Sequence, residues 1–439
     1  MKISFEKQFT TNALSSMYYN KIIHRASVGM DRVIPDSFHK DLDSNLEIIS
    51  RKVLNGSYKF THYKQLLISK GRDSAPRVIS IPTIRDKLTL AVCHRFLQES
   101  FIKDIEEPLL HSVIGDIKSK IQTGEYDSYV KVDIRRFYSS IDHRILLSKL
   151  ERRISDKRAI ALVENAISTA TVPNDTALPK NLKNERGVPE GLSISNILAN
   201  IYLSDLKEIM LGRYPIEYFR YVDDILILCK ESDAKYIEED MTNFVQVIYK
   251  LDVNAEKTEY GKLSDGVIFL GYEFYNDRIG VRLSAIQKLE SSIEMLFRLY
   301  SREIIEEQLF LWRLNLKISG CIFEEEKYGW LFYYSQLTDI KVLYHLDWYI
   351  SKLMERFKVR ADLKVKKFVR TYYEIIKNLS KSTYLINTDK YDTAKKRSVI
   401  QTVLPKKVVP TDPKEVDERF KILMFREIQK LEHDIQHFS

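Results

Sequence analysis

The chain has 439 residues, of which 44% are hydrophobic and 30% charged, so a globally disordered protein is excluded and roughly three domains are expected. No run approaches the ~18 apolar residues of a membrane span, and the first twenty residues lack the apolar core of a signal peptide. Cys93, Cys229 and Cys321 lie far apart without CxxC spacing, which argues against a disulfide framework and a zinc ribbon. These features predict a cytoplasmic protein that does not associate with membranes.

The formal net charge of +8 is concentrated near the C-terminus. Residues 351–439 hold 21 Lys and Arg against 12 Asp and Glu, whereas the other 350 residues are near neutral at 48 against 49. The excess is strongest over residues 351–410, with 16 against 5. A bound nucleic acid and a solvated helical face rich in lysine both account for this charge. Aromatic residues between the lysines fit either stacking on bases or packing in a core.

The N-terminal quarter is predicted to be mainly helical. An apolar stripe at helical spacing runs through Phe38, Leu42, Leu46 and Ile49. The Gly- and Pro-containing segment 71–76 predicts a turn or loop between two extended runs, and Pro82 closes the second run at 77–81. Another helix is expected through Leu88, Val92 and Phe96.

A strand with an acidic face is predicted next. Residues 128–134 alternate, with Val130, Val132 and Ile134 on one face and Asp133 on the other. A helix is expected after Asp142, a surface loop over 172–187 and a second helix from Ser193.

A hairpin is predicted over residues 216–230, because two β-like runs flank the sequence Val-Asp-Asp at 222–224. A helix over 237–248 and a strand over 267–275, turning at 276–277, follow it. This order of elements is close to a ferredoxin-like split β-α-β. Beyond residue 285 the chain is predicted to be mostly helical, with 381–413 as a linker.

Three acidic residues carry the chemical signal. Asp133 lies on a predicted strand, and Asp223 and Asp224 lie at the predicted hairpin tip. Carboxylates that converge repel one another unless a cation lies among them, and oxygen ligands completed by substrate phosphates are what Mg²⁺ prefers. The alternative is that Asp-Asp in a hairpin is only turn chemistry.

The order of the motifs over roughly residues 25–345 resembles that of the reverse transcriptases. RYVDD at 220–224 is similar to the catalytic hairpin of that family, and GVPEG at 187–191 is similar to its loop under the template and incoming base. The loop at 187–191 continues into a similar helix at 195–200 as part of the same motif, and four further motifs that resemble the family lie at 77–82 with 85–86, 132–141, 254–258 and 269–272. One such motif is a weak signal, but six in order are a strong one.

The resemblance implies roles for individual residues. Asp133, Asp223 and Asp224 are expected to be catalytic and to hold two Mg²⁺ ions, with Mn²⁺ as a substitute and the Ile134 carbonyl as an extra ligand. Lys257 is expected to act as a general acid on pyrophosphate; the alternative is a surface lysine.

The incoming deoxynucleoside triphosphate (dNTP) has its own expected contacts. Arg77, with Lys70 or Arg72, is expected to clamp the triphosphate, and Gly191 lies in the loop beneath the nucleotide. For Lys70 and Arg72 the alternative is solvated loop charge. Tyr138 is expected to stack under the deoxyribose and exclude a 2′-hydroxyl; its alternative is core packing.

The template and primer are expected to meet Pro189, Glu190, Ser195, Asn200, Leu270 and Gly271, the last two in a segment similar to the primer grip. Glu190 replaces the Gln that is common in the family, and Asn196 stands where intron-encoded members usually carry Pro. An added negative charge at Glu190 is expected to alter template handling.

The fold implied by the resemblance is an α+β right-hand polymerase. The expected parts are N-terminal helices and fingers at 1–125, a palm with the split β-α-β core at 126–284, a helical thumb at 285–360 and a basic helical C-terminal extension at 361–439. The palm is expected to carry an insertion at about 155–186.

The sequence is most similar to the stand-alone bacterial reverse transcriptases of abortive infection and phage defence. The expected partners are an RNA template, in particular a non-coding RNA, a DNA primer or product and dNTPs; homo-oligomerisation is left open. Two other functions remain: untemplated or protein-primed DNA synthesis at the same site, and a catalytically silent RNA-binding scaffold.

Overall fold

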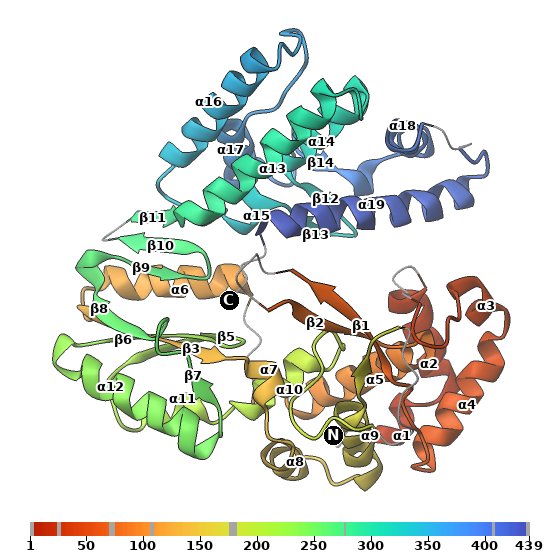
Figure 1. Cartoon of the computed structure of the whole chain (residues 1–439), viewed down its shortest axis with the longest axis vertical. Coiled ribbons are helices and arrows are strands. Elements are labelled where there is room, and N and C mark those ends of the chain that lie inside the picture. The colour runs from red at the N-terminus through yellow and green to blue at the C-terminus, as the bar shows by residue number, and fades with distance from the viewer. Residues whose placement is uncertain are drawn as a thin grey trace. The chain divides into compact units, whose positions relative to one another are not determined.

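The computed structural model of the chain describes residues 4–23, 28–69, 75–105, 109–174, 182–275, 278–405 and 409–435. These residues form two compact units (Figure 1). Unit 1 comprises Met1–Pro108 and Ser128–Gly261, and unit 2 comprises Leu109–Asp127 and Lys262–Ser439.

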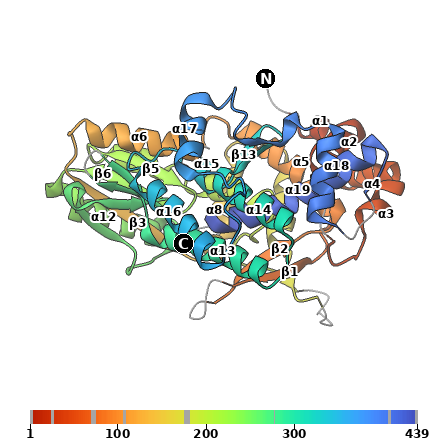
Figure 2. The same cartoon turned by 90° about the horizontal axis from the view of Figure 1, so that it is seen from above.

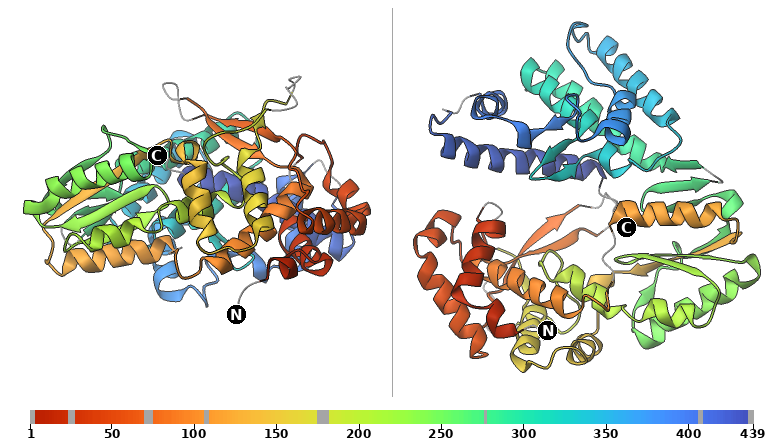
Figure 3. Two further views of the ribbon diagram at one scale, coloured as in Figure 1. Left: turned by 90° about the horizontal axis from the view of Figure 1, so that it is seen from below. Right: turned by 180° about the vertical axis from the view of Figure 1, so that it is seen from behind.

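The N-terminal helices of unit 1 pack together as a bundle, seen in red in Figures 2 and 3. They are α1 (Phe5–Gln8), α2 (Thr11–Met17), the π-helix η1 (Tyr18–Ile22), α3 (Pro35–Lys40) and α4 (Leu42–Leu54). The Thr10 hydroxyl caps α2 by accepting from the Ala13 amide, and Pro35 occupies the first turn of α3. The predicted apolar stripe is confirmed, because Phe38, Leu42, Leu46 and Ile49 are all buried.

The two extended runs around residues 71–76 pair with each other. β1 (Tyr63–Ile68) and β2 (Arg77–Ile81) are antiparallel, and the short β4 (Thr171–Val172) joins β1 in parallel. Thr83, after Pro82, caps the predicted helix, α5 (Ile84–Ser100), by accepting from the Asp86 amide. The same part of unit 1 contains α9 (Lys157–Ser168).

The central sheet of unit 1 has the strand order β5-β6-β3-β7, with β8 also paired to β3. Its strands are β3 (Ser128–Arg135), β5 (Glu217–Tyr221), β6 (Asp224–Cys229), β7 (Asp252–Val253) and β8 (Glu259–Lys262). The predicted alternation of β3 is confirmed: Val130, Val132 and Ile134 are buried, whereas Asp133 is only partly so. The predicted hairpin is also confirmed, with β5 antiparallel to β6.

Helices cover this sheet and lead into it (Figure 1). They are α7 (Phe137–Ser140), α8 (His143–Glu151), α10 (Ser195–Tyr202), α11 (Leu206–Leu211), α12 (Glu231–Asn243) and the π-helix η2 (Phe244–Ile248). The Asp142 carboxylate caps α8 by accepting from the Arg144 and Ile145 amides, and α12 packs on β3.

The single strand predicted over residues 267–275 is wrong. Unit 2 instead contains two strands, β9 (Val267–Phe269) and β10 (Tyr272–Tyr275), paired as a hairpin, and β11 (Arg278–Val281) pairs with β10. The two residues between β9 and β10, Leu270 and Gly271, have φ of 50° and 79°. Positive φ at both central positions is typical of the tightest hairpin turns, so Leu-Gly makes the turn. The turn predicted at 276–277 lies outside the described residues.

The rest of unit 2 is mainly helical, as predicted. Its helices are α6 (Leu110–Gln122), α13 (Leu283–Ser301), α14 (Glu307–Ser319), α15 (Trp330–Tyr333), α16 (Lys341–Arg356), α17 (Phe368–Asn378), α18 (Thr393–Val403) and α19 (Pro413–Ile435), with 3₁₀ turns η3 (Leu263–Asp265) and η4 (Thr388–Lys390). A small sheet joins β12 (Cys321–Phe323), β13 (Glu326–Tyr328) and β14 (Ile386–Asn387).

The linker predicted at 381–413 is wrong for much of its length. It contains β14 and α18, and α18 packs along α19 (Figure 2). Its polar composition comes from the solvent face of α18, while Val399 and Ile400 join a core with Phe420 and Met424 of α19. Within the described ranges, none of the helices combines the length and the apolar character needed to cross a membrane.

A buried ion pair joins α14 to α19 in unit 2. Arg313 donates from Nε and Nη2 to Glu427 at 2.9 and 2.8 Å, and Glu427 is 4% exposed. We expect Glu427→Ala to lower the free energy of unfolding by about 2–4 kcal/mol, because it leaves the largely buried guanidinium uncompensated. Trp312, Trp330 and Trp348 all lie in unit 2, so tryptophan fluorescence in urea measures this unfolding.

The matched control is Glu418→Ala, an exposed glutamate on the same helix, which should change stability by less than about 0.5 kcal/mol. An equal loss in the two variants would show that the Arg313–Glu427 pair adds nothing beyond helix propensity.

Candidate active site

The pairing of β3 with β6 brings two of the three predicted acids together. Asp133 on β3 lies directly opposite Asp224 at the start of β6 in the antiparallel register. Asp224 is also opposite Tyr221 in the β5–β6 hairpin, so only Val222 and Asp223 form the turn between these strands. The three carboxylates therefore gather at one end of the central sheet.

The turn that carries Asp223 is strained. Val222 has φ of 59°, which a β-branched residue rarely adopts. Arg220 donates from Nη1 to the Val222 carbonyl and to Asn200 Oδ1, both at 3.1 Å. Arg220 thus links the turn to α10. The sequence reasoning placed Arg220 in a motif but gave it no role.

The electrostatics of the acids reflect their proximity. Burial, followed by repulsion from Asp223 and Asp133, raises the pKa of Asp224 to about 7. Burial is also the main cause of the raised pKa of Asp223, to which Asp133 adds and which Arg77 partly offsets. The cluster is a site of concentrated negative charge that favours a cation.

Asp133 is held by the segment that follows β7. Asn254 donates from Nδ2 to Asp133 Oδ2 at 3.0 Å, and its backbone amide donates to the Asp133 carbonyl at 2.8 Å. Lys257 Nζ lies 3.8 Å from Asp133 Oδ1. The predicted Lys257 therefore does lie beside the carboxylates. The positioning contact from Asn254 was missed, although its Asn-x-x-Lys-Thr motif was recognised.

Arg77 is paired in this structure with a residue of the 187–191 loop. Its Nε donates to the Glu190 carboxylate, and the Ser80 amide donates to the Glu190 carbonyl at 2.7 Å. Gly191 has φ of +96°, and a Cβ there would lie 2.7 Å from Ile79 Cγ2. Only glycine allows the loop to approach β2 this closely. The ion pair between Arg77 and Glu190 was not foreseen.

Tyr138 connects this loop with the acids. Its hydroxyl donates to Asn196 Oδ1 at 2.7 Å. The pKa of Tyr138 is raised by burial first and then by the charges of Asp223 and Glu190. The Tyr138 ring is partly exposed, whereas Phe137 is fully buried, so Phe137 fills the core and Tyr138 borders the site.

Helix α10, which follows the 187–191 loop, is bonded both to that loop and to Arg220, which holds the turn at Val222. Ser195 donates from Oγ to the Pro189 carbonyl at 2.7 Å, which ties the start of α10 to the loop. Asn200, five residues further along α10, accepts the hydrogen bond from Arg220 and is 8% exposed. Both side chains are therefore occupied by contacts within the protein.

The remaining predicted site residues are Lys70, Arg72, Ile134, Leu270 and Gly271. Lys70 and Arg72 lie outside the described residues. Leu270 and Gly271 belong to unit 2, where the Leu270 carbonyl accepts from Tyr333 Oη at 3.0 Å and the Gly271 carbonyl accepts from the Arg282 amide at 2.9 Å. Ile134 is buried on β3 and pairs with Val253.

The donor set fits a hard divalent cation. Asp133, Asp223 and Asp224 supply only oxygen, and each of the pair at the turn has its pKa raised partly by another carboxylate. Among the described residues, no group of three or more His, Cys, Asp or Glu is close enough to enclose an ion by itself.

The comparisons with known proteins agree with this chemistry. The family model described as reverse transcriptase (RNA-dependent DNA polymerase) matches residues 68–274. Protein YkfC of Escherichia coli K12 is 24% identical over 295 residues, which cover 57% of this chain and 76% of YkfC. The group II intron-encoded protein LtrA of Lactococcus lactis is 22% identical over 367 residues, which cover 66% of this chain and 59% of LtrA.

A solved structure of telomerase from Candida albicans, in complex with a fragment of telomeric RNA, is 14% identical with a TM-score of 0.44 over 90% of this chain and 66% of that one. The predicted α+β right-hand polymerase class is confirmed by the family match, which spans β2, the central sheet and the acids. Residues 68–274 therefore match the reverse transcriptase family, whose members are RNA-directed DNA polymerases.

Proposed function

We propose that the carboxylate end of the central sheet joins dNTPs to a primer 3′-hydroxyl on an RNA template. The observation that carries this proposal is the β3–β6 register, which sets Asp133 opposite Asp224 with Asp223 in the adjoining turn. A scaffold without catalysis has no use for a group of carboxylates that repel one another.

The acids are proposed to hold two Mg²⁺ ions, for which Mn²⁺ is a substitute. When bound, such ions supply activation of the primer hydroxyl and stabilisation of the leaving pyrophosphate. Asn254 fixes the Asp133 carboxylate, and Arg220 fixes the turn, so the ligands are oriented before substrate arrives. Lys257, 3.8 Å from Asp133, is positioned to give a proton to pyrophosphate.

The nucleotide pocket is proposed to lie between Arg77, Tyr138 and the loop at Gly191. Arg77 would meet the triphosphate, and Tyr138, held by Asn196, would stack under the sugar. In the described structure Arg77 binds Glu190 instead, so triphosphate binding requires that this ion pair open. Glu190 thus competes with substrate for the same guanidinium.

We infer further that the template is a dedicated non-coding RNA, contacted in part by the basic region 351–410, and that the enzyme acts in the cytoplasm in bacterial defence against phage. The motif resemblance and the charge excess of 16 Lys and Arg against 5 acids support this part. Sequencing of nucleic acid bound to the purified protein tests it: DNA complementary to one discrete RNA is expected, and DNA unrelated to any bound RNA would contradict templated synthesis.

Removing one central carboxylate should abolish polymerisation. Asp223→Asn keeps the size of the side chain but removes its charge, so we expect dNTP incorporation on an RNA template to fall by at least about 100-fold. RNA binding, measured by filter retention, should stay within about twofold. The control is Asp43→Asn, an exposed aspartate on α4 of the same unit. Full incorporation by Asp223→Asn would exclude this site as the polymerase centre.

Tyr138 should determine the choice of sugar. We expect Tyr138→Ala to lower the ratio of kcat/KM for dNTP to that for ribonucleotide by about 10–100-fold, mainly by improving ribonucleotide use, since it opens space for a 2′-hydroxyl. Tyr236→Ala, an exposed tyrosine on α12, is the matched control. Equal losses of kcat/KM for dNTP and ribonucleotide would mean that the Tyr138 ring only packs against its neighbours and does not select the sugar.

The native Glu190 carboxylate should weaken dNTP binding, because it pairs with Arg77. The Arg77–Glu190 pair is partly exposed, with side chains 39% and 25% exposed, so it is worth at most about 1 kcal/mol. We therefore expect Glu190→Gln to lower the KM for dNTP by up to about fivefold with kcat almost unchanged, whereas Arg77→Ala should raise it. Glu239→Gln, which breaks an exposed pair on α12, is the control. An unchanged KM in Glu190→Gln would show that Arg77 does not meet the triphosphate.

A further inference from the structure

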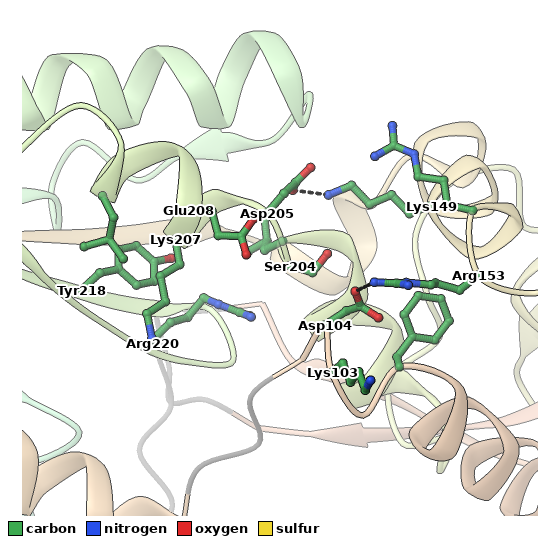
Figure 4. A pocket seen from close by; sticks show the side chains of 14 residues that line it. Lys103, Asp104, Lys149, Arg153, Ser204, Asp205, Lys207, Glu208, Tyr218 and Arg220 are labelled. Carbon is green, nitrogen blue, oxygen red and sulfur yellow. Dashed lines mark hydrogen bonds and ion pairs between the residues drawn. The ribbon is translucent and has the colours of Figure 1, made fainter. Parts of the chain in front are cut away.

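A cationic pocket of about 520 Å³ opens in unit 1, on the side of β5 from which Tyr218 and Arg220 project (Figure 4). It lies among the end of α5, the end of α8, the segment between α10 and α11, and β5. Six of its lining side chains are basic: Lys103, Lys149, Arg152, Arg153, Lys207 and Arg220. Of these six residues, Arg220 also contacts the turn of the proposed polymerase centre, and the other five have no role there.

The charge in the pocket is not balanced by its acids. Asp104 and Asp205 are engaged in ion pairs with Arg153 and Lys149, as the dashed lines in Figure 4 show. Glu208 is the third acid of the lining, so three acids stand against six basic side chains. The pocket therefore has an excess of positive charge that an anion would neutralise.

Lys149 is a cation that the fold holds in a fixed, buried position in this pocket. Its pKa is lowered by burial first, and the charges of Arg152 and Arg220 lower it further against the opposing effect of Asp205. Lys149 is only 8% exposed, and its ammonium group lies 4.9 Å from the centre of the Tyr249 ring. Tyr249 in turn donates to Asp205 Oδ1 at 2.6 Å. The floor of the pocket is thus fixed before any ligand binds.

The lining suits a phosphate chain better than a single carboxylate. Guanidinium groups bind phosphate oxygens through two donors at once, and Arg152 and Arg220 approach the pocket from different elements. The volume falls within the usual range for small-molecule sites, about 300–1,000 Å³. We propose that this pocket binds the phosphate chain of a small polyphosphate, such as a nucleoside triphosphate, and that Arg220 links its occupancy to the turn at Val222.

Arg220 supports this link because it belongs to both places. It lines the pocket, and it also donates to the Val222 carbonyl and Asn200 Oδ1. A guanidinium has five N–H donors, so it can keep these bonds and still bind phosphate. A bound anion restricts the side chain and thereby orders the strained turn that carries Asp223.

Calorimetric titration of the full chain with tripolyphosphate, without divalent metal, tests the binding site. The background variant Arg77→Ala removes the competing triphosphate contact. We expect the background variant to bind one equivalent of tripolyphosphate. Adding Lys103→Glu and Arg152→Glu gives the pocket variant, which should bind at least about tenfold more weakly, because both side chains are exposed pocket cations. The single changes Lys103→Ala and Arg152→Ala should give intermediate losses, which guards against misfolding of the doubly reversed variant.

The matched control carries Arg51→Glu and Lys157→Glu, two exposed cations of unit 1 outside the pocket. The proposed site would be overturned if the background and the pocket variant bound tripolyphosphate with equal affinity. It would also be overturned if the pocket and control variants lost the same amount of affinity. ATP serves as a second probe: binding at least as tight as that of tripolyphosphate identifies a nucleotide, and weaker binding identifies inorganic polyphosphate, both at the proposed site.

Hydrogen–deuterium exchange tests the link to the turn without measuring catalysis. In the Arg77→Ala background, tripolyphosphate should slow exchange at least about twofold in a peptide covering residues 217–229, and not in the pocket variant. Binding without any change in that peptide would overturn the role of Arg220. Because neither measurement uses polymerisation, both outcomes are independent of the proposed function.

Discussion

The structure of the site depends on the register between β3 and β6. A shift of one residue along either strand would move Asp133 away from Asp224 and turn its side chain toward the face occupied by Val130, Val132 and Ile134. Those three residues are buried, so such a shift would place aliphatic groups in water and a carboxylate in the core. The hydrophobic alternation of one strand therefore fixes the position of the acids.

The acids themselves work against the fold. Burial raises the pKa of Asp224 to about 7, and repulsion from Asp223 and Asp133 adds to this effect. Val222 adds backbone strain at the same turn. The protein holds this arrangement through contacts that come from elsewhere: Asn254 holds Asp133, and Arg220 holds the turn. Stability is given up locally so that the ligands are already oriented.

Period-two and helical patterns in the sequence predicted the parts of the fold that depend on local burial, such as β3, the β5–β6 hairpin and α5. They failed where a short turn interrupts a hydrophobic run. Residues 267–275 look like one strand because Leu270 is apolar, yet Leu270 and Gly271 both adopt positive φ and form a turn. The polar segment at 381–413 was mistaken for a linker because its few apolar residues are buried against residues of α14, β12 and α19, which lie outside it.

The acids and Lys257 could be predicted because their motifs are short and their chemistry is specific. The partners of those residues could not, since Arg77 and Glu190 are 113 residues apart and no local pattern joins them. The same holds for Arg220, whose place in a motif says nothing of the cations from α5 and α8 around it.

The turn at Val222 lies between two opposite concentrations of charge, the carboxylates of Asp133, Asp223 and Asp224 and the cations that line the pocket with Arg220. Either group alone would be unfavourable, because like charges are crowded in each. Arg220 donates to the carbonyl of Val222, directly before the acids, and so brings positive charge to the turn without forming an ion pair with them. Because the Val222 carbonyl and Asn200 Oδ1 accept the hydrogen bonds from Arg220, the carboxylates stay available for a cation. The separation by one strained residue is therefore what lets a positive and a negative site coexist on one hairpin.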